Sequence, residues 1–254
     1  MADAPDSTFQ KSSPSYRLPA LDETFLLGES MRGVRFLLEY SKAEEILNAW
    51  NILSTIVVFG SARAKPDDDG ERGRWYRIAR EFGEIASTRG GALDGNHHAR
   101  RNVIATGGGP GIMEAANRGA HDAGAPSIGF NITLPEEQDP NPYSTPELTF
   151  QFHYFAMRKM HLAMHANALV VFPGGFGTLD EMFEILTLRQ TRKMPKMPIV
   201  VMDKAYWTSV INFEVLADHG TINREDLDLF HFADTAEEAW ELIEAAGVTA
   251  EDDA

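Results

Sequence analysis

The feature of this sequence that most constrains its fold is a repeated order of short apolar strand, glycine turn and amphipathic helix. Residues 54–63 (STIVVFGSAR) form a β-branched run that ends near a glycine, and residues 102–124 contain strand, glycines and helix in one stretch. Further apolar runs stand at 127–134, 168–175 and 197–203. These runs lack polar alternation, which is typical of parallel strands covered on both faces. The sequence therefore predicts an α/β fold: a Rossmann-like, doubly wound parallel sheet with helices on both faces.

Helical patterns separate the predicted strands. Residues 73–90 repeat apolar side chains at helical spacing and end at Gly90, residues 152–167 are also helical, and another helix begins directly after the glycines near 175. The proline-rich segment 135–147 is predicted to be a loop, and the chain after 203 is predicted to be helical. Residues 29–50 predict one or two helices before the sheet begins, so extra helices are expected at both ends of the chain.

The 254 residues suggest one domain with short extensions. Residues 1–20 are rich in Ser, Pro and Asp and predict a flexible N-terminal tail. Residues 21–248 are expected to form a single Rossmann-like domain, and residues 249–254 an acidic tail.

Composition excludes several classes of function. The formal net charge of −15 repels nucleic acid, so neither DNA nor RNA is expected as a partner. No apolar run of about 18 residues occurs, and the first residues lack a signal-peptide core, so no membrane association is expected. The absence of cysteine excludes disulfides and thiolate chemistry and favours a cytoplasmic protein.

Glycines mark the ends of three predicted strands. In such a sheet the ligand lies at the carboxyl ends of the strands. The segment 106–117 (TGGGPGIMEAAN) partly resembles a dinucleotide-binding turn, although Pro110 and Gly111 break the usual spacing. The alternative explanation is a tight turn between strand and helix with no ligand.

The segment 173–181 (PGGFGTLDE) is a stronger candidate for an anion site, because glycines at a helix start let backbone amides approach a phosphate. A structural explanation is also available: Thr178 as N-cap with Glu181 three residues later fits a capping box. That explanation does not account for Gly174, Gly175 and Gly177 together, since each glycine costs chain entropy.

The predicted helix 155–167 contributes two adjacent cations, Arg158 and Lys159, just before the strand that leads into the glycines. Three methionines at helical spacing are predicted to be core residues: Met157, Met160 and Met164. Arg158 shares a neighbouring face with His161 and His165, which are alternatively explained as partly buried structural residues. Cations beside a phosphate cradle make electrostatic sense. Adjacent His97 and His98 lack metal-ligand spacing, so no metal site is predicted.

With GSAR, TGGGPGIMEAAN, MRK and PGGFGTLDE in this order, residues 30–210 resemble the LONELY GUY (LOG) family of cytokinin riboside 5′-monophosphate phosphoribohydrolases, long misnamed lysine decarboxylases. The family cleaves the N-glycosidic bond of an adenine nucleotide to free base and ribose 5-phosphate, and many bacterial members act on AMP. The resemblance implies that Arg158 and Glu181 are the catalytic pair. It implies substrate contacts at Ser61, Gly108, Gly109, Glu137, Lys159, Gly174, Gly175, Phe176, Gly177, Thr178, Asp180 and Thr187.

The resemblance also suggests a reaction that needs no metal or redox cofactor. Glu181 would stabilise an oxocarbenium-like ribose and orient or deprotonate water, while amides of Gly175, Gly177 and Thr178 hold the phosphate. Arg158 would neutralise phosphate, position ribose hydroxyls or assist the leaving base; the sequence does not distinguish these roles.

Family members form at least homodimers, so a homo-oligomer is expected. The main alternative is a nucleotide- or cofactor-binding carrier on the same fold; a lysine decarboxylase would instead need pyridoxal phosphate on a Schiff-base lysine.

Overall fold

The structure is a computed structural model that describes residues 6–93, 99–135 and 139–250. It divides the chain into two compact units, Met1–Lys42 and Ala43–Ala254. The first unit contains the short helices α1 (Thr8–Ser12) and α2 (Glu23–Leu26). It also contains 3₁₀ turns at Pro14–Tyr16, Pro19–Leu21 and Glu29–Met31. The longer helix α3 (Arg32–Ala49) begins in the first unit and ends in the second. The predicted boundaries of the N-terminal tail (1–20), the Rossmann-like domain (21–248) and the acidic tail (249–254) stay predictions.

The second unit is built on a seven-stranded sheet in which every pair of neighbouring strands is parallel. The strands are β1 (Thr55–Phe59), β2 (Val103–Thr106), β3 (Ser127–Ile132), β4 (Thr149–Phe152), β5 (Ala166–Val171), β6 (Ile199–Met202) and β7 (His231–Ala233). Their order across the sheet is β4-β3-β2-β1-β5-β6-β7. The predicted Rossmann-like α/β fold is confirmed.

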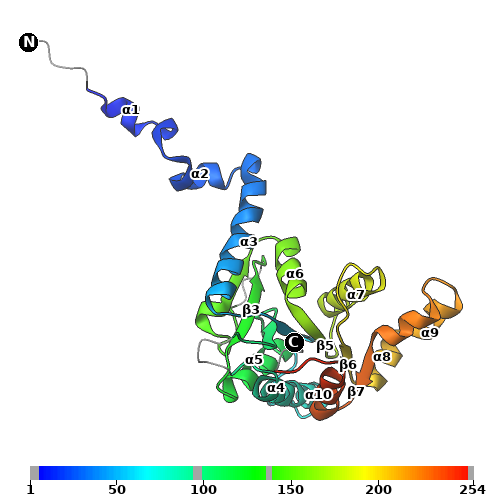
Figure 1. Cartoon of the computed structure of the whole chain (residues 1–254). Coiled ribbons are helices and arrows are strands. Elements are labelled where there is room, and N and C mark those ends of the chain that lie inside the picture. The colour runs from blue at the N-terminus through cyan, green and yellow to red at the C-terminus, as the bar shows by residue number, and fades with distance from the viewer. Residues whose placement is uncertain (1–5, 94–98, 136–138, 251–254) are drawn as a thin grey trace, which may run out of the picture. The chain divides into compact units, whose positions relative to one another are not determined.

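Helices cover both faces of the sheet (Figure 1). They are α4 (Glu71–Arg89), α5 (Ile112–Asp122), α6 (Phe155–Met164), α7 (Phe176–Gln190), α8 (Lys204–Val210), α9 (Phe213–Asp218) and α10 (Ala236–Ala245), with 3₁₀ turns at Pro146–Leu148 and Arg224–Leu229. Alternate side chains of each strand enter different clusters: Ile56 and Val58 pack with α4, α5 and α10, whereas Val57 and Phe59 pack with α6 and α7. This double burial explains why the strands are apolar throughout.

The order of the strands locates the expected ligand site. The chain moves outward from β1 through β2, β3 and β4, then returns to place β5 on the other side of β1. The carboxyl ends of β1 and β5 are therefore the point where the chain direction across the sheet reverses, and such a point leaves a crevice above the sheet. The GSAR segment follows β1 and the PGGFGT segment follows β5.

Two strands were not predicted. The edge strand β4 lies between the predicted loop 135–147 and the predicted helix 152–167 and overlaps only the first residue of that helix, and β7 lies in a region predicted to be helical only. Both are short and pair with one neighbour at an edge, β4 with β3 and β7 with β6. Neither sequence, TFQF in β4 or HFA in β7, is part of a continuous apolar run like those that marked the predicted strands. Within the three described ranges, no helix combines the length and apolar character that crossing a membrane requires.

Candidate functional site

A cleft of about 680 Å³ lies at the carboxyl ends of β1 and β5. This volume is in the range of small-molecule sites. Ten residues predicted for the site line it: Ser61, Arg158, Lys159, Gly174, Gly175, Phe176, Gly177, Thr178, Asp180 and Glu181. Loops far apart in the sequence therefore converge on one hollow, as the positions of the glycines predicted.

The glycine loop leads into α7 differently from the predicted capping box. The helix begins at Phe176 with Gly175 as N-cap, and no side chain caps it. Thr178 lies inside the first turn, so the capping box of Thr178 and Glu181 is wrong. A Cβ on Gly174 would lie 2.1 Å from Thr178 Oγ1, so the glycine leaves room for this side chain to pack back on the loop. The helix starts earlier than expected because the glycines themselves supply its N-terminus.

Gly175 and Gly177 have a different environment. A Cβ at either position would meet no atom within 4 Å. Neither glycine is needed to avoid a contact inside the protein. Both leave the backbone at the helix start open to a ligand, where the first N–H groups lack an intrahelical acceptor and the helix dipole favours an anion. The amide of Thr178 donates to Gly175 O at 3.0 Å, so the free donors of the loop are expected before it.

Glu181 lies one turn into α7 and is 3% exposed. Its Oε1 atom is buried and has no hydrogen-bond partner among the described residues. Burial raises the pKa of Glu181 to about 7, with Lys159 opposing the shift and Glu184 adding to it. A carboxyl group with this pKa can exchange a proton near neutral pH, which suits a general base or acid.

Lys159 stands among three carboxylates of α7. Its Nζ lies 2.9 Å from Asp180 Oδ2 and 4.0 Å from Glu181 Oε2, and it also pairs with Glu184. Burial lowers the pKa of Lys159, but its hydrogen bonds with Glu184 and Asp180 outweigh this effect and leave the pKa raised. Lys159 is therefore a fixed ammonium ion at the edge of the cleft. Asp180 is mostly exposed and reaches both the cleft and this ion pair.

A hydrogen bond to the backbone of β3 positions the side chain of Arg158. Its Nε donates to Phe130 O at 2.8 Å, at the carboxyl half of β3. Burial lowers the pKa of its guanidinium, while Glu181 and Asp180 oppose that shift. An arginine remains charged in proteins, so Arg158 presents a positive charge to the cleft that it lines together with Glu181.

Two predicted contacts, Gly108 and Gly109, are not among the lining residues of the cleft. Their carbonyl groups accept hydrogen bonds from Asn141, Gly108 O from its backbone N at 2.8 Å and Gly109 O from its Nδ2 at 3.2 Å. Gly108 has φ +71°, a conformation that glycine adopts readily. In this structure the turn anchors the loop before β4. Gly107 leaves space for Arg158, since a Cβ on Gly107 would lie 2.3 Å from Arg158 Nη2.

Two other predicted contacts lie elsewhere. Thr187 lines a neighbouring hollow of about 470 Å³ together with Lys159 and Asp180, and its Oγ1 donates to Phe183 O at 2.7 Å. Glu137 lies outside the described residues, as do His97 and His98. Where the chain is described, no group of three or more His, Asp or Glu residues is placed to hold a metal ion.

The cleft also contains aromatic residues that sequence reasoning missed. Phe155, Trp75 and Tyr206 line it with Phe176, which is 92% exposed. Trp75 comes from α4 and Tyr206 from α8, two helices that carry no motif. The sequence marks Trp75 and Tyr206 only as aromatic residues near the start of a helix that follows a strand. Aromatic residues at such positions more often belong to the core, so neither was predicted for the site.

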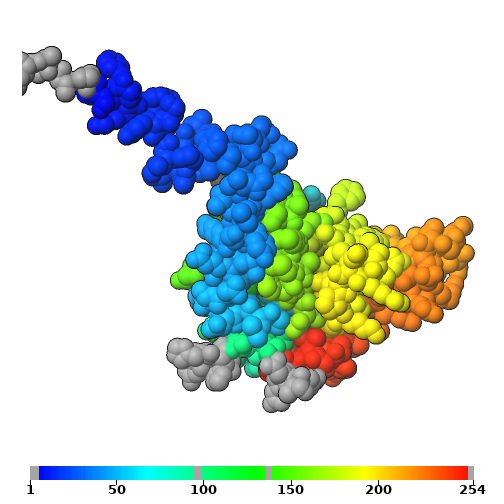
Figure 2. All heavy atoms as spheres, turned by 45° about the horizontal axis from the view of Figure 1, so that its top comes forward, coloured from blue at the N-terminus to red at the C-terminus, as the bar shows by residue number. Residues whose placement is uncertain are grey.

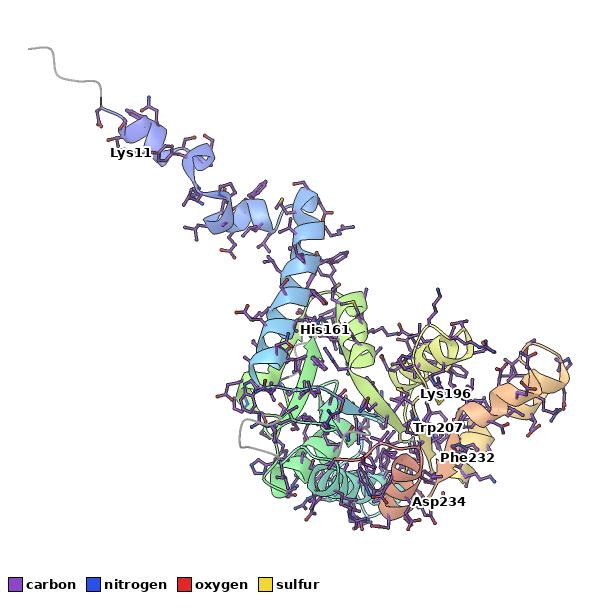
Figure 3. The ribbon with its side chains drawn as sticks, in the orientation of Figure 1. Lys11, His161, Lys196, Trp207, Phe232 and Asp234 are labelled. Atoms are coloured by element: carbon purple, nitrogen blue, oxygen red, sulfur yellow. The ribbon has the colours of Figure 1, made fainter. Side chains whose placement is uncertain are left out.

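The methionines of α6 are not all buried, contrary to the prediction, and its histidines have structural contacts. Met157 packs against the core, but Met160 and Met164 are exposed, so their prediction as core residues is wrong. His161, labelled in Figure 3, is fully buried, and its Nδ1 lies 2.8 Å from Met157 O. His165 Nε2 lies 2.9 Å from Glu44 Oε1. His161 is thus bonded within α6, while His165 joins the end of α6 to α3, and both roles match the structural explanation.

The fold is that of a Rossmann-like α/β protein, and the cleft at its switch point is the candidate ligand site. The family model described as possible lysine decarboxylase matches residues 113–243. The chain belongs to this family, the LOG family.

Relatives and a solved structure agree with this assignment. Cytokinin riboside 5′-monophosphate phosphoribohydrolase LOG3 of Arabidopsis thaliana is 27% identical over 168 residues, which cover 64% of this chain and 77% of that protein. The probable cytokinin riboside 5′-monophosphate phosphoribohydrolase LOG4 of Oryza sativa subsp. japonica is 28% identical over 57% of this chain and 64% of its own length. The X-ray structure of TM1055 superposes with a TM-score of 0.54 at 26% identity, covering 76% of this chain and 99% of that one.

Proposed function

We propose that this protein hydrolyses the N-glycosidic bond of an adenine-type nucleoside 5′-monophosphate, AMP or a cytokinin riboside 5′-monophosphate, to free base and ribose 5-phosphate. The observation that carries the proposal is Glu181: a buried carboxylate with an unpartnered oxygen, at one end of a glycine loop open to an anion. The relatives named as phosphoribohydrolases support the same reaction class.

The proposed reaction assigns different parts of the cleft to different parts of the substrate. The 5′-phosphate binds the amides at the start of α7, where Gly175 and Gly177 leave space for it. The ribose then lies near Glu181, which stabilises the positive charge that develops on the sugar as its bond to the base breaks, and which takes a proton from the attacking water. The base leaves with the bonding electrons and takes up a proton, from Glu181 or from solvent. Phe176 offers an exposed aromatic face at which a base can stack.

The positive side chains offset the charge of the substrate. Three carboxylates of α7 surround Lys159, so a phosphate dianion would be repelled without Arg158 and Lys159. Arg158 faces the cleft from α6, and its Nε is already committed to Phe130 O. Its remaining N–H groups are therefore the ones available to a phosphate or ribose oxygen.

The alternative function is a carrier that binds a nucleotide or cofactor on this fold without hydrolysing it. A binder has no need for a desolvated carboxylate, because burying a charge without a partner costs stability. A lysine decarboxylase, the function in the family's description, would need a neutral lysine amine for a Schiff base. Lys159 is the one lysine that lines the cleft among the described residues, and its raised pKa keeps it protonated.

We further propose that the chain forms a homo-oligomer through α6 and α7. These helices lie side by side in Figure 2 and border a groove of about 620 Å³ lined by Met160, Met164 and Leu188, among others. Lys196, labelled in Figure 3, lines the same groove. Exposed apolar side chains gathered in this way are typical of an interface. The groove shares Lys159 and Glu184 with the ion cluster beside the cleft, so an oligomer contact here would adjoin the site.

The experiment that tests the function is a panel of nucleoside 5′-monophosphates, including AMP and prenylated AMP, assayed for release of free base. Release of adenine from either compound supports the hydrolase, and the ratio of kcat/KM values identifies the preferred base. Binding of AMP by calorimetry without release of base would support the carrier. A purified protein that lacks the visible absorbance of an internal aldimine would oppose the decarboxylase.

A further inference from the structure

Tyr206 connects the helix after β6 to the glycine loop after β5. Its hydroxyl donates a hydrogen bond to Gly174 O at 3.0 Å. The residue belongs to α8, lines the cleft and directly precedes Trp207, whose position is labelled in Figure 3. The bond therefore joins the ends of two neighbouring strands at the place where the loop turns into α7.

The peptide between Gly174 and Gly175 is the part of the loop that most needs a hydrogen bond to fix its orientation. Two consecutive glycines leave the backbone more conformational freedom than any other pair, and a peptide between them can rotate with little steric hindrance. In a trans peptide the C=O and N–H point in opposite directions. Holding Gly174 O against Tyr206 therefore fixes the direction in which the Gly175 N–H points, away from Tyr206.

Tyr206 is itself held by Asp203 and Trp75. Asp203 is 7% exposed; its Oδ1 accepts from Tyr206 N at 2.9 Å and its Oδ2 from Trp75 Nε1 at 2.7 Å. Arg74 donates to the same Oδ2. The rings of Trp75 and Tyr206 meet edge to face with centroids 5.4 Å apart. These contacts join α4, the end of β6 and the start of α8 into one support.

The backbone of Asp203 indicates that this support is maintained against a local cost. Its φ is +69°, in the left-handed region that few residues other than glycine adopt. A helix N-cap normally has extended backbone, so capping α8 does not require this conformation. Such a conformation persists only where the surrounding contacts determine it, and these positions cluster at ligand sites.

We propose that Asp203, Trp75 and Tyr206 are positioning residues that fix the Gly174–Gly175 peptide so that the Gly175 amide points at the substrate phosphate. The inference rests on the proposed function for the identity of the phosphate ester. Its geometry concerns any phosphate-bearing ligand of the cleft. None of the three residues transfers a proton or contacts the reacting bond in this scheme. Their contribution is to substrate binding through the loop.

The test removes one oxygen atom. In Tyr206→Phe the ring stays and the hydrogen bond to Gly174 O is lost. We expect the KM for AMP and the calorimetric Kd for ribose 5-phosphate to rise about tenfold, the size of effect of one hydrogen bond, with kcat changed less than about twofold. Trp75→Phe, which deletes the bond to Asp203, should shift both constants in the same direction by a smaller factor.

Tyr76→Phe is the matched control. Tyr76 also comes from α4 and its hydroxyl lies 2.8 Å from Glu114 Oε1, but it does not line the cleft. This variant should keep the KM and Kd of the wild type even if its melting temperature falls.

The proposal is overturned if Tyr206→Phe binds ribose 5-phosphate as the wild type does, or if it lowers kcat and leaves KM unchanged. Equal weakening in the Tyr76→Phe control would overturn it as well, because the effect would then be general. Calorimetry distinguishes a failure of the positioning proposal from a failure of the proposed hydrolase function. A wild type that binds ribose 5-phosphate but releases no base contradicts the hydrolase, while the variants still decide the positioning role. A wild type that binds neither AMP nor ribose 5-phosphate contradicts both.

Discussion

Gly107 and Arg158 are in direct contact: a Cβ on Gly107 would lie 2.3 Å from Arg158 Nη2. The glycine turn after β2 therefore serves the cleft without lining it, by leaving the space in which the guanidinium lies. Together with the bond from Arg158 Nε to Phe130 O, this contact fixes the guanidinium from two sides.

Gly107→Ala should displace Arg158 and lower kcat/KM for base release by about 100-fold, because small misplacements of a positioned group have effects of this size. The atoms that the new methyl group meets, Arg158 Nη2 and Met113 Sδ, are side-chain ends that can move, so the protein should still fold. Gly33→Ala is the control: no atom lies within 4 Å of its added Cβ, and alanine favours the helix. Wild-type kinetics in Gly107→Ala would contradict the role of this contact.

Glu181→Gln should lower kcat by about 10²- to 10⁴-fold, the range for loss of a general acid or base, while KM changes little. The substitution keeps the shape of the side chain and removes its charge. Glu81→Gln, an exposed carboxylate of α4, is the charge-matched control and should behave as the wild type. In the wild type, kcat/KM should rise with pH through an ionisation near 7, because kcat/KM reports the free enzyme, in which the pKa of Glu181 is raised to about 7 and the ionised form is the active one. A value of kcat/KM that does not change between pH 6 and 8 would argue against Glu181 as the base.

The same pKa predicts how stability depends on pH. The pKa of Glu181 is raised from 4.5 in the unfolded chain to about 7 in the folded protein, so its contribution is most favourable below pH 4.5 and is lost as pH rises through 7. Glu181→Gln should therefore be more stable than the wild type at pH 8, by at most about 3.5 kcal/mol at about 1.4 kcal/mol per pKa unit. The difference should shrink toward pH 5. Denaturant unfolding of both proteins at the two pH values measures it, and a variant that is less stable at pH 8 would contradict the desolvation of this carboxylate.

Met164→Glu should weaken the proposed homo-oligomer. Met164 is 42% exposed and lines the groove between α6 and α7, where a new carboxylate would have to be desolvated on association. Sedimentation velocity should show a shift toward the monomer at low micromolar concentration. Val210→Glu, at an exposed position of α8 outside this groove, should leave the sedimentation coefficient unchanged. A stable oligomer in Met164→Glu would move the interface to another surface.

The fold could largely be predicted from local patterns. The strands β1, β2, β3, β5 and β6 are apolar on both faces, and that property is visible in the sequence because helices cover both sides of the sheet. The edge strands β4 and β7 could not be predicted, because neither lies in a continuous apolar run and each pairs with a single neighbouring strand at the edge of the sheet.

For the site, the sequence by itself determined which loops converge: glycines at the ends of β1 and β5, and a basic pair before β5, must meet where parallel strands end. Only the tertiary structure decided how each group behaves. Glu181 fits a capping box by spacing, yet the helix starts at Phe176 and the carboxylate is buried without a partner. Met160 and Met164 have core spacing but face outward. Spacing along the chain sets which residues share an element, whereas burial, pKa and hydrogen-bond partners depend on what packs against that element from elsewhere in the chain.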